Sequence, residues 1–208
     1  MKIVIFGATG TIGRVLVAQA LSEGHAVTAF TRSGKFEGDQ HANLSIVQGD
    51  VLDGKAVSAA IKGQEAVICT LGAGRNGVVR SKGTENILNG MKDHGVNRFI
   101  CQSTLGAGDS AGNLNFFWKN IMFGMLLRPA MADHNLQENS VRKSDVDWTI
   151  VRPAAFTDGP VTGNYQHGFP GNSPKGLALK ISRADVAHFL LKQLKSDAYL
   201  NQAASLSY

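Results

Sequence analysis

The stretch Lys2-Ile3-Val4-Ile5-Phe6-Gly7-Ala8-Thr9-Gly10-Thr11-Ile12-Gly13 decides the fold of this 208-residue chain. A short apolar run of strand type leads into three glycines spaced three apart, where a helical apolar period begins. In such a turn glycines permit a tight bend, close approach of backbone N–H groups to a pyrophosphate, and close packing of helix on strand. We therefore predict a dinucleotide site, against the alternative of a simple tight turn. The residues predicted to bind the cofactor here are Gly7, Thr9, Gly10, Thr11, Ile12 and Gly13.

Strand-like and helix-like segments alternate from this turn to the end of the chain. The predicted strands are 2–6, 26–31, 44–47, 65–71, 97–102, 147–151 and 203–207. The predicted helices are 11–23, 54–62, 78–94, 130–144 and 183–195. Several strand runs are continuously apolar, which is typical of strands buried on both faces. The pattern predicts an α/β fold with a doubly wound parallel sheet of Rossmann type, in a single domain over 1–208.

Residues 154–176 break this alternation. They contain five glycines and three prolines with little periodicity. A loop of this length in a compact domain is usually functional, so we expect a substrate-side loop that acts as a lid or a wall. A solvated surface excursion is the alternative.

Composition and spacing exclude several classes of site. The net charge of +5 has no basic run, which favours a small anionic ligand over nucleic acid. Cys69 and Cys101 lie in apolar runs without ligand spacing, so we expect buried reduced thiols. The histidines also lack ligand spacing, so we expect no metal. The N-terminal apolar run is too short for a signal peptide and 114–127 too short for a transmembrane segment, which predicts a cytoplasmic protein.

The end of the second predicted strand identifies the dinucleotide by charge. A carboxylate at this position would accept from a ribose 2′-hydroxyl and repel a 2′-phosphate. This chain has Thr31-Arg32-Ser33 instead, and a guanidinium can bind a phosphate bidentately. We therefore predict NADP(H), bound through Arg32, against the alternative of a solvated arginine at a strand end.

Two further strand ends supply candidate cofactor contacts, because open parallel sheets bind ligands at their carboxyl edge. Asp50 can accept from an adenine amino group and Val51 can pack on the ring, although Asp50 also suits a cap or turn. Leu71 and Gly72 place backbone beside the cofactor. Arg75 offers a second cation to the phosphates or is a plain surface arginine.

The fifth predicted strand ends in the candidate catalytic edge. Ser103 and Thr104 can hydrogen-bond the nicotinamide amide or the acceptor, or simply cap a turn. No histidine base stands in motif spacing to them, so covalent catalysis is unsupported. We expect His134 to face solvent, with a position at the active edge as the alternative.

The segment 114–127 is apolar around most of its circumference and must be covered by something. Its aromatic and methionine side chains suit buried structure or a subunit contact in a homodimer. They also suit a wall against a planar acceptor, or docking on a membrane surface.

Several of these motifs occur together in a known family. They are the Gly7–Gly13 turn, Arg32, Gly49-Asp50-Val51, Leu71-Gly72 and Val151-Arg152-Pro153. In this combination the chain resembles an atypical short-chain dehydrogenase/reductase, and within it the biliverdin-IX beta reductase/flavin reductase group and the NmrA-like NAD(P)-binding proteins. The resemblance implies an NADPH-dependent reductase of flavins, quinones or open-chain tetrapyrroles. It also implies that Pro153 lines the nicotinamide pocket and that Arg152 pairs structurally.

Two departures from the family narrow the expected chemistry. None of the tyrosines, at 165, 199 and 208, has a lysine four residues later, so the usual proton donor pair is missing. In the biliverdin reductase branch a histidine occupies the position that Ala154 matches here, directly after Pro153. Its absence weakens the case for a tetrapyrrole substrate. A flavin or quinone delocalises the incoming electrons and can take its proton from water. We therefore expect hydride transfer to a flavin or quinone-like planar acceptor, with a non-catalytic NADP(H) sensor acting on a protein partner as the alternative.

Overall fold

The computed structural model describes residues 1–38, 40–72, 77–171, 174 and 176–208. Within this part of the chain a central sheet has eight strands in the order β3-β2-β1-β4-β5-β6-β10-β8, all parallel except β8. The strands are β1 (Lys2–Phe6), β2 (Ala26–Thr31), β3 (Leu44–Gln48), β4 (Ala66–Cys69), β5 (Arg98–Gln102), β6 (Asp147–Pro153), β8 (Gln166–Gly168) and β10 (Gln202–Ser207). The predicted doubly wound α/β fold is confirmed.

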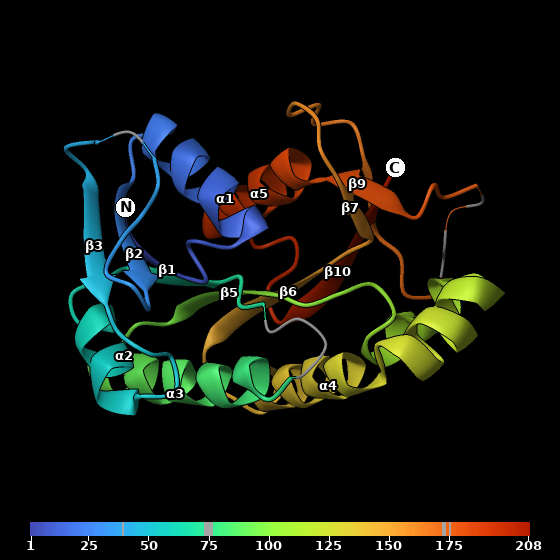
Figure 1. Ribbon diagram of the computed structural model, residues 1–208, viewed down its shortest axis with the longest axis horizontal. Helices are drawn as coiled ribbons and strands as arrows, with labels where there is room; N and C mark the ends of the chain where they lie inside the picture. Colours follow the sequence, from blue (N-terminus) through green and yellow to red (C-terminus); the bar gives the residue numbers. More distant parts are fainter. Residues whose placement is uncertain (39, 73–76, 172–173, 175) are drawn as a thin grey trace.

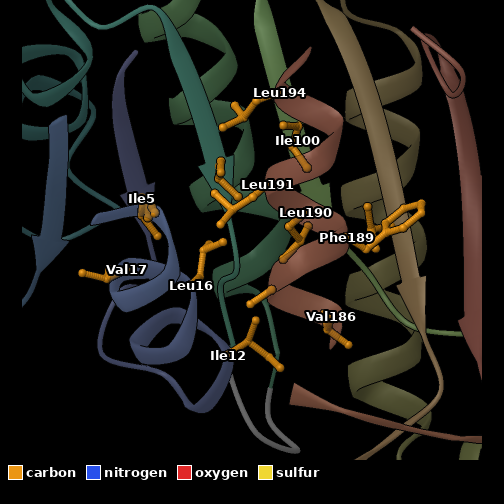
Figure 2. Close-up of a cluster of buried hydrophobic side chains, with 14 of the residues drawn as sticks. Ile5, Ile12, Leu16, Val17, Ile100, Val186, Phe189, Leu190, Leu191 and Leu194 are labelled. Carbon is orange, nitrogen blue, oxygen red and sulfur yellow. The ribbon is translucent and has the colours of Figure 1, made fainter. Parts of the chain in front are cut away.

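Helices cover both faces of this sheet (Figure 1). One face packs against α1 (Thr11–Ser22) and α5 (Arg183–Lys192), and the other against α2 (Gly54–Ile61), α3 (Val79–His94) and α4 (Arg128–Arg142). Successive side chains of a strand point to opposite faces. Ile3 and Ile5 of β1 therefore join the first core, which Figure 2 shows between α1 and α5, while Val4 and Phe6 join the second.

The strand order positions the site. From β1 the chain first builds outward through β2 and β3, and it then returns to the other side of β1 to add β4, β5 and β6. Open sheets of this kind form a ligand crevice at the carboxyl ends of the strands where the order reverses. That point lies between β1 and β4, directly above the glycine turn.

The region predicted as one irregular loop contains regular structure. Within 154–176 the chain forms β7 (Ala155–Thr157) and β8, and β7 pairs in parallel with β9 (Lys180–Ser182). These strands are three residues long, which is too short for an apolar period to reveal them. The fourth strand also ends earlier than predicted, at Cys69, since the chain turns there toward the crevice.

The apolar segment before α4 lies largely on the surface. After a 3₁₀ helix (Gly108–Asn113) the chain forms a π-helix (Phe117–Leu126), drawn in yellow-green at the sheet end in Figure 1. Phe116 is 76% exposed and Met125 is 74% exposed, so burial of this segment within its own chain is wrong. A subunit contact, an acceptor wall and membrane docking stay predictions. Among the described residues no helix combines the length and apolar character that a bilayer crossing requires.

Candidate functional site

The glycine turn after β1 has no room for side chains. Gly7 adopts a φ of +86°, and a Cβ there would lie 2.5 Å from the carbonyl oxygen of Thr70. A Cβ at Gly13 would lie 2.1 Å from the carbonyl oxygen of Gly7. The turn is closed by the Gly10 N–H, which donates to the Gly7 carbonyl at 2.9 Å. Glycine is therefore required for backbone conformation at Gly7 and for helix packing at Gly13.

The amino terminus of α1 offers free backbone N–H donors to a diphosphate. Gly10 is its N-cap and supplies no side chain, and the first turn holds no acidic residue. The first N–H groups of a helix have no partner inside it and carry a partial positive charge. An anion can therefore approach the bare backbone of this turn, which fits a dinucleotide.

A cavity of about 670 Å³ begins at this turn and follows the carboxyl edge of the sheet. Most of the predicted site residues line it. They are Gly7, Thr9, Gly10, Thr11, Ile12, Arg32, Asp50, Val51, Leu71, Gly72, Ser103 and Thr104. Gly13 lies beneath the turn, where it lets the helix pack. Arg75 lies outside the described residues.

The end of the cavity beside β2 and β3 carries Arg32 and Asp50. Arg32 is exposed, and its carbonyl oxygen accepts a hydrogen bond from Gln48 Nε2 at 3.3 Å. No ion pair among the described residues uses its guanidinium. Asp50 Oδ1 accepts from the Leu52 N–H at 2.9 Å, so the turn role is present, while the adenine contact stays a prediction.

The opposite end of the cavity contains a buried Ser103–His134 pair. Ser103 Oγ lies 3.4 Å from His134 Nδ1, and the Ser103 N–H donates to the Val151 carbonyl at 2.7 Å. His134 is only 9% exposed, so the prediction that it faces solvent is wrong. His134 lies on the buried face of α4, together with Ala130, Asp133 and Gln137, and this placement turns it away from solvent. Burial, assisted by the charge of Arg80, lowers the pKa of His134 to about 3.

Backbone hydrogen bonds also hold Thr104 and Pro153 in place at this end of the cavity. The Thr104 carbonyl accepts from the Ala107 N–H at 3.1 Å, so Thr104 takes part in a turn as well as lining the cavity. Pro153 is buried at the end of β6, where its carbonyl accepts from the Leu105 N–H at 2.9 Å. It stands behind Leu105 and is absent from the cavity lining, so its contact with nicotinamide stays a prediction.

Comparison with known proteins identifies the family. A sequence model described as NAD(P)H-binding matches residues 7–197, nearly the whole chain and the entire cavity. The chain belongs to this NAD(P)H-binding family. The dinucleotide predicted from the glycine turn is therefore confirmed as a class.

Relatives of this NAD(P)H-binding protein differ in their described roles. It is 31% identical over 185 residues to an uncharacterized chloroplastic protein of Arabidopsis thaliana, covering 78% of this chain and 62% of that protein. It is 26% identical over 212 residues to the photosystem II assembly factor Ycf39 of Synechocystis, covering 95% of this chain and 60% of that protein. The chain thus spans less than two thirds of either relative.

A solved structure gives the likeness in three dimensions. ChuY, an anaerobillin reductase from Escherichia coli O157:H7, is 26% identical with a TM-score of 0.78, covering 99% of this chain and 96% of ChuY. The fold of this NAD(P)H-binding chain is therefore shared with a reductase over almost its entire length.

Several residues of the cavity wall were not predicted from the sequence, and three of them add chemistry to it. Arg80 comes from the first turn of α3, and its side chain is 10% exposed. Gln102 ends β5, and its buried Oε1 has no hydrogen-bond partner in the described part of the chain. Phe156 comes from β7, with the Arg183 guanidinium 5.7 Å from its ring centroid. For Arg80 and Gln102, the only signal in the sequence is that a polar residue stands next to an apolar run.

Behind the cavity the buried cation Arg152 has a structural role, as the resemblance implied. Its side chain is fully buried and donates to Glu138 through Nε at 2.9 Å and Nη2 at 2.6 Å. Its Nη1 donates to Asp109 at 2.5 Å. Two carboxylates therefore compensate one buried guanidinium and fix β6 against α4.

Proposed function

We propose that this protein is an NADPH-dependent oxidoreductase that transfers hydride to a flavin or a quinone-like planar acceptor. The observation that carries the proposal is one continuous cavity. It starts at the diphosphate turn of α1 and ends at the buried Ser103–His134 pair, between β4, β5 and α4. A cofactor and a second planar ring can therefore share one cavity.

Arg32 supports NADPH as the preferred cofactor. It stands beside β2, where an acidic residue would otherwise select NADH, and its guanidinium is available to a phosphate. The chain itself then holds the two anionic parts of the cofactor, the diphosphate at α1 and the 2′-phosphate at Arg32.

The Ser103–His134 end of the cavity supports an acceptor that does not need a proton from a protein side chain. With a pKa of about 3, His134 is neutral at physiological pH and lies within hydrogen-bond distance of Ser103, so it does not act as a charged proton donor. Bound NADPH supplies the hydride, and the reduced flavin or quinone takes its proton from water. Ser103 and His134 then position the reactants, since orientation alone removes a large part of a hydride-transfer barrier.

The test is anaerobic steady-state oxidation of NADPH by FMN, riboflavin, menadione and biliverdin. Biliverdin is included because ChuY, similar over almost the whole chain, is an anaerobillin reductase. Turnover with at least one of these acceptors, faster with NADPH than with NADH, is expected. Tight NADPH binding without turnover on any acceptor would refute the proposal.

A sensor without catalysis is the second candidate, supported by the likeness to the photosystem II assembly factor Ycf39. Such a sensor must bind NADP⁺ and NADPH with different affinities, because its coupling to a partner is reciprocal. Calorimetry with both nucleotides tests this candidate; equal affinities would exclude it.

A further inference from the structure

Arg80 is a buried cation at the cavity wall, and two of its donor atoms are not used by any residue that the structure describes. Its Nε and Nη1 have no hydrogen-bond partner within the described residues, although the side chain is only 10% exposed. A guanidinium carries five N–H donors, and unpaired buried donors destabilise a fold. This side chain is therefore suited to an acceptor group that the described residues do not supply.

Asp133 balances the charge of Arg80 without filling its donors. Its Oδ2 lies 3.5 Å from Arg80 Nη1, which makes an ion pair but not an aligned hydrogen bond. The carboxylate instead accepts from the N–H of Arg80 at 3.2 Å, the N–H of Ser81 at 3.1 Å and Ser81 Oγ at 2.6 Å. These bonds fix Asp133 at the amino terminus of α3, beside the Arg80 guanidinium.

The position of Arg80 along the carboxyl edge of the sheet indicates which ligand group it faces. Arg32 follows β2, whereas Arg80 starts α3 and lies near His134, whose pKa its charge helps to lower. Ser103 and His134 mark the end of the cavity beside β5, and β5 is three places from β2 in the sheet, a spacing of ~14 Å between the two strands. The diphosphate site at α1 lies between them. Beyond the diphosphate a pyridine dinucleotide ends in a ribose and a nicotinamide, which carry no anionic oxygen. An anion at Arg80 must therefore come from another molecule.

We propose that Arg80 binds an anionic oxygen group of the acceptor, a carboxylate or a phosphate, and so selects acceptors that carry one. This inference rests on the reductase function proposed above. Asp133 is already committed to the α3 backbone, and His134 is neutral, so neither competes for the ligand. Arg80 is a specificity residue in this account and takes no part in hydride transfer.

The experiment compares acceptors that share a reacting ring and differ in their anionic group. FMN is paired with riboflavin, and biliverdin with its dimethyl ester. Each is assayed as oxidant of NADPH with the wild type, Arg80→Gln, Arg80→Lys and, as a matched control on the outer part of α4, Arg142→Gln. Losing a charge-assisted hydrogen bond should lower the preference for the charged member by about 10- to 100-fold in Arg80→Gln. The change should appear in KM, with Arg80→Lys intermediate and the control unchanged.

Two results would overturn the inference while leaving the reductase intact. One is an unchanged FMN-to-riboflavin ratio of kcat/KM in Arg80→Gln. The other is a loss of NADPH affinity as large as the loss for FMN, which would assign Arg80 to the cofactor diphosphate. If no acceptor is reduced, the proposed function fails. FMN and riboflavin binding to the NADP⁺ complex, measured by flavin fluorescence, then tests Arg80 separately, and equal binding refutes it.

If Arg80→Gln does not fold, two other measurements still test the inference. Arg80→Lys keeps the charge opposite Asp133. Inorganic phosphate should inhibit the wild type competitively against FMN and much less against riboflavin. Inhibition that competes with NADPH instead would overturn the inference.

Discussion

Arg32→Ala tests whether one exposed guanidinium decides between NADPH and NADH. The side chain is exposed and has no ion-pair partner in the described part of the chain, so its removal leaves no buried group uncompensated. Hydrogen bonds to charged groups contribute about 1.5 to 3 kcal/mol, and solvent screening at an exposed site favours the lower half of that range. A loss of about 1.5 to 2 kcal/mol corresponds to a rise of about 10- to 30-fold in the Kd for NADPH.

Isothermal titration calorimetry at one fixed salt concentration measures this change. The Kd for NADH should move by less than about twofold, because NADH lacks the phosphate that Arg32 binds. Arg142→Ala provides the control, since Arg142 lies on α4 and is not part of the cavity lining. An unchanged ratio of the two dissociation constants in Arg32→Ala would refute the assignment. A parallel loss for both nucleotides would assign Arg32 to a group that they share.

Three further substitutions test the site and its supports, with unfolding followed by urea titration. Gly7→Ala should destabilise by about 2 kcal/mol or more and abolish NADPH binding, whereas Gly24→Ala, at a similar φ of +79° but with open space around it, should cost about 1 kcal/mol. Arg152→Met should cost about 3 to 5 kcal/mol by leaving the buried Glu138 carboxylate with only its longer 3.7 Å contact to Arg142, against less than about 1 kcal/mol for Arg183→Met, whose partner Asp158 is exposed. His134→Gln should reduce the acid sensitivity of the fold between pH 6.5 and about 3, because the unfolded imidazole binds a proton that the buried one refuses.

The sign of the histidine effect follows from its lowered pKa. Between pH 6.5 and about 3 the unfolded state binds more protons at His134 than the folded state does. The wild-type protein is therefore less stable as the pH is lowered through this range. At pH 5 this amounts to about 2 kcal/mol relative to neutral pH, which the glutamine variant should not lose. Equal acid sensitivity of the two proteins would contradict the buried neutral state. Similarly, equal costs of Gly7→Ala and Gly24→Ala, or of Arg152→Met and Arg183→Met, would contradict the packing described.

Local sequence was sufficient for the sheet and for the cofactor half of the site. A strand, three glycines and a helix are consecutive in the chain, so their geometry follows from backbone sterics and helix termini alone. Arg32 is tied to the same unit by the short second strand. The short strands β7 and β9 escaped prediction because their pairing partners are distant in sequence and their own runs carry no period.

The amino-acid sequence by itself determined that the chain forms a doubly wound sheet and binds a dinucleotide, because both depend on periodicity and on contacts between near neighbours. The tertiary structure decided the far end of the cavity. Ser103, His134 and Arg80 belong to three different elements and meet only when α3 and α4 pack beside β5. That packing buries His134, which keeps it neutral, and it leaves two Arg80 donors without a partner among the described residues; no local pattern encodes either effect.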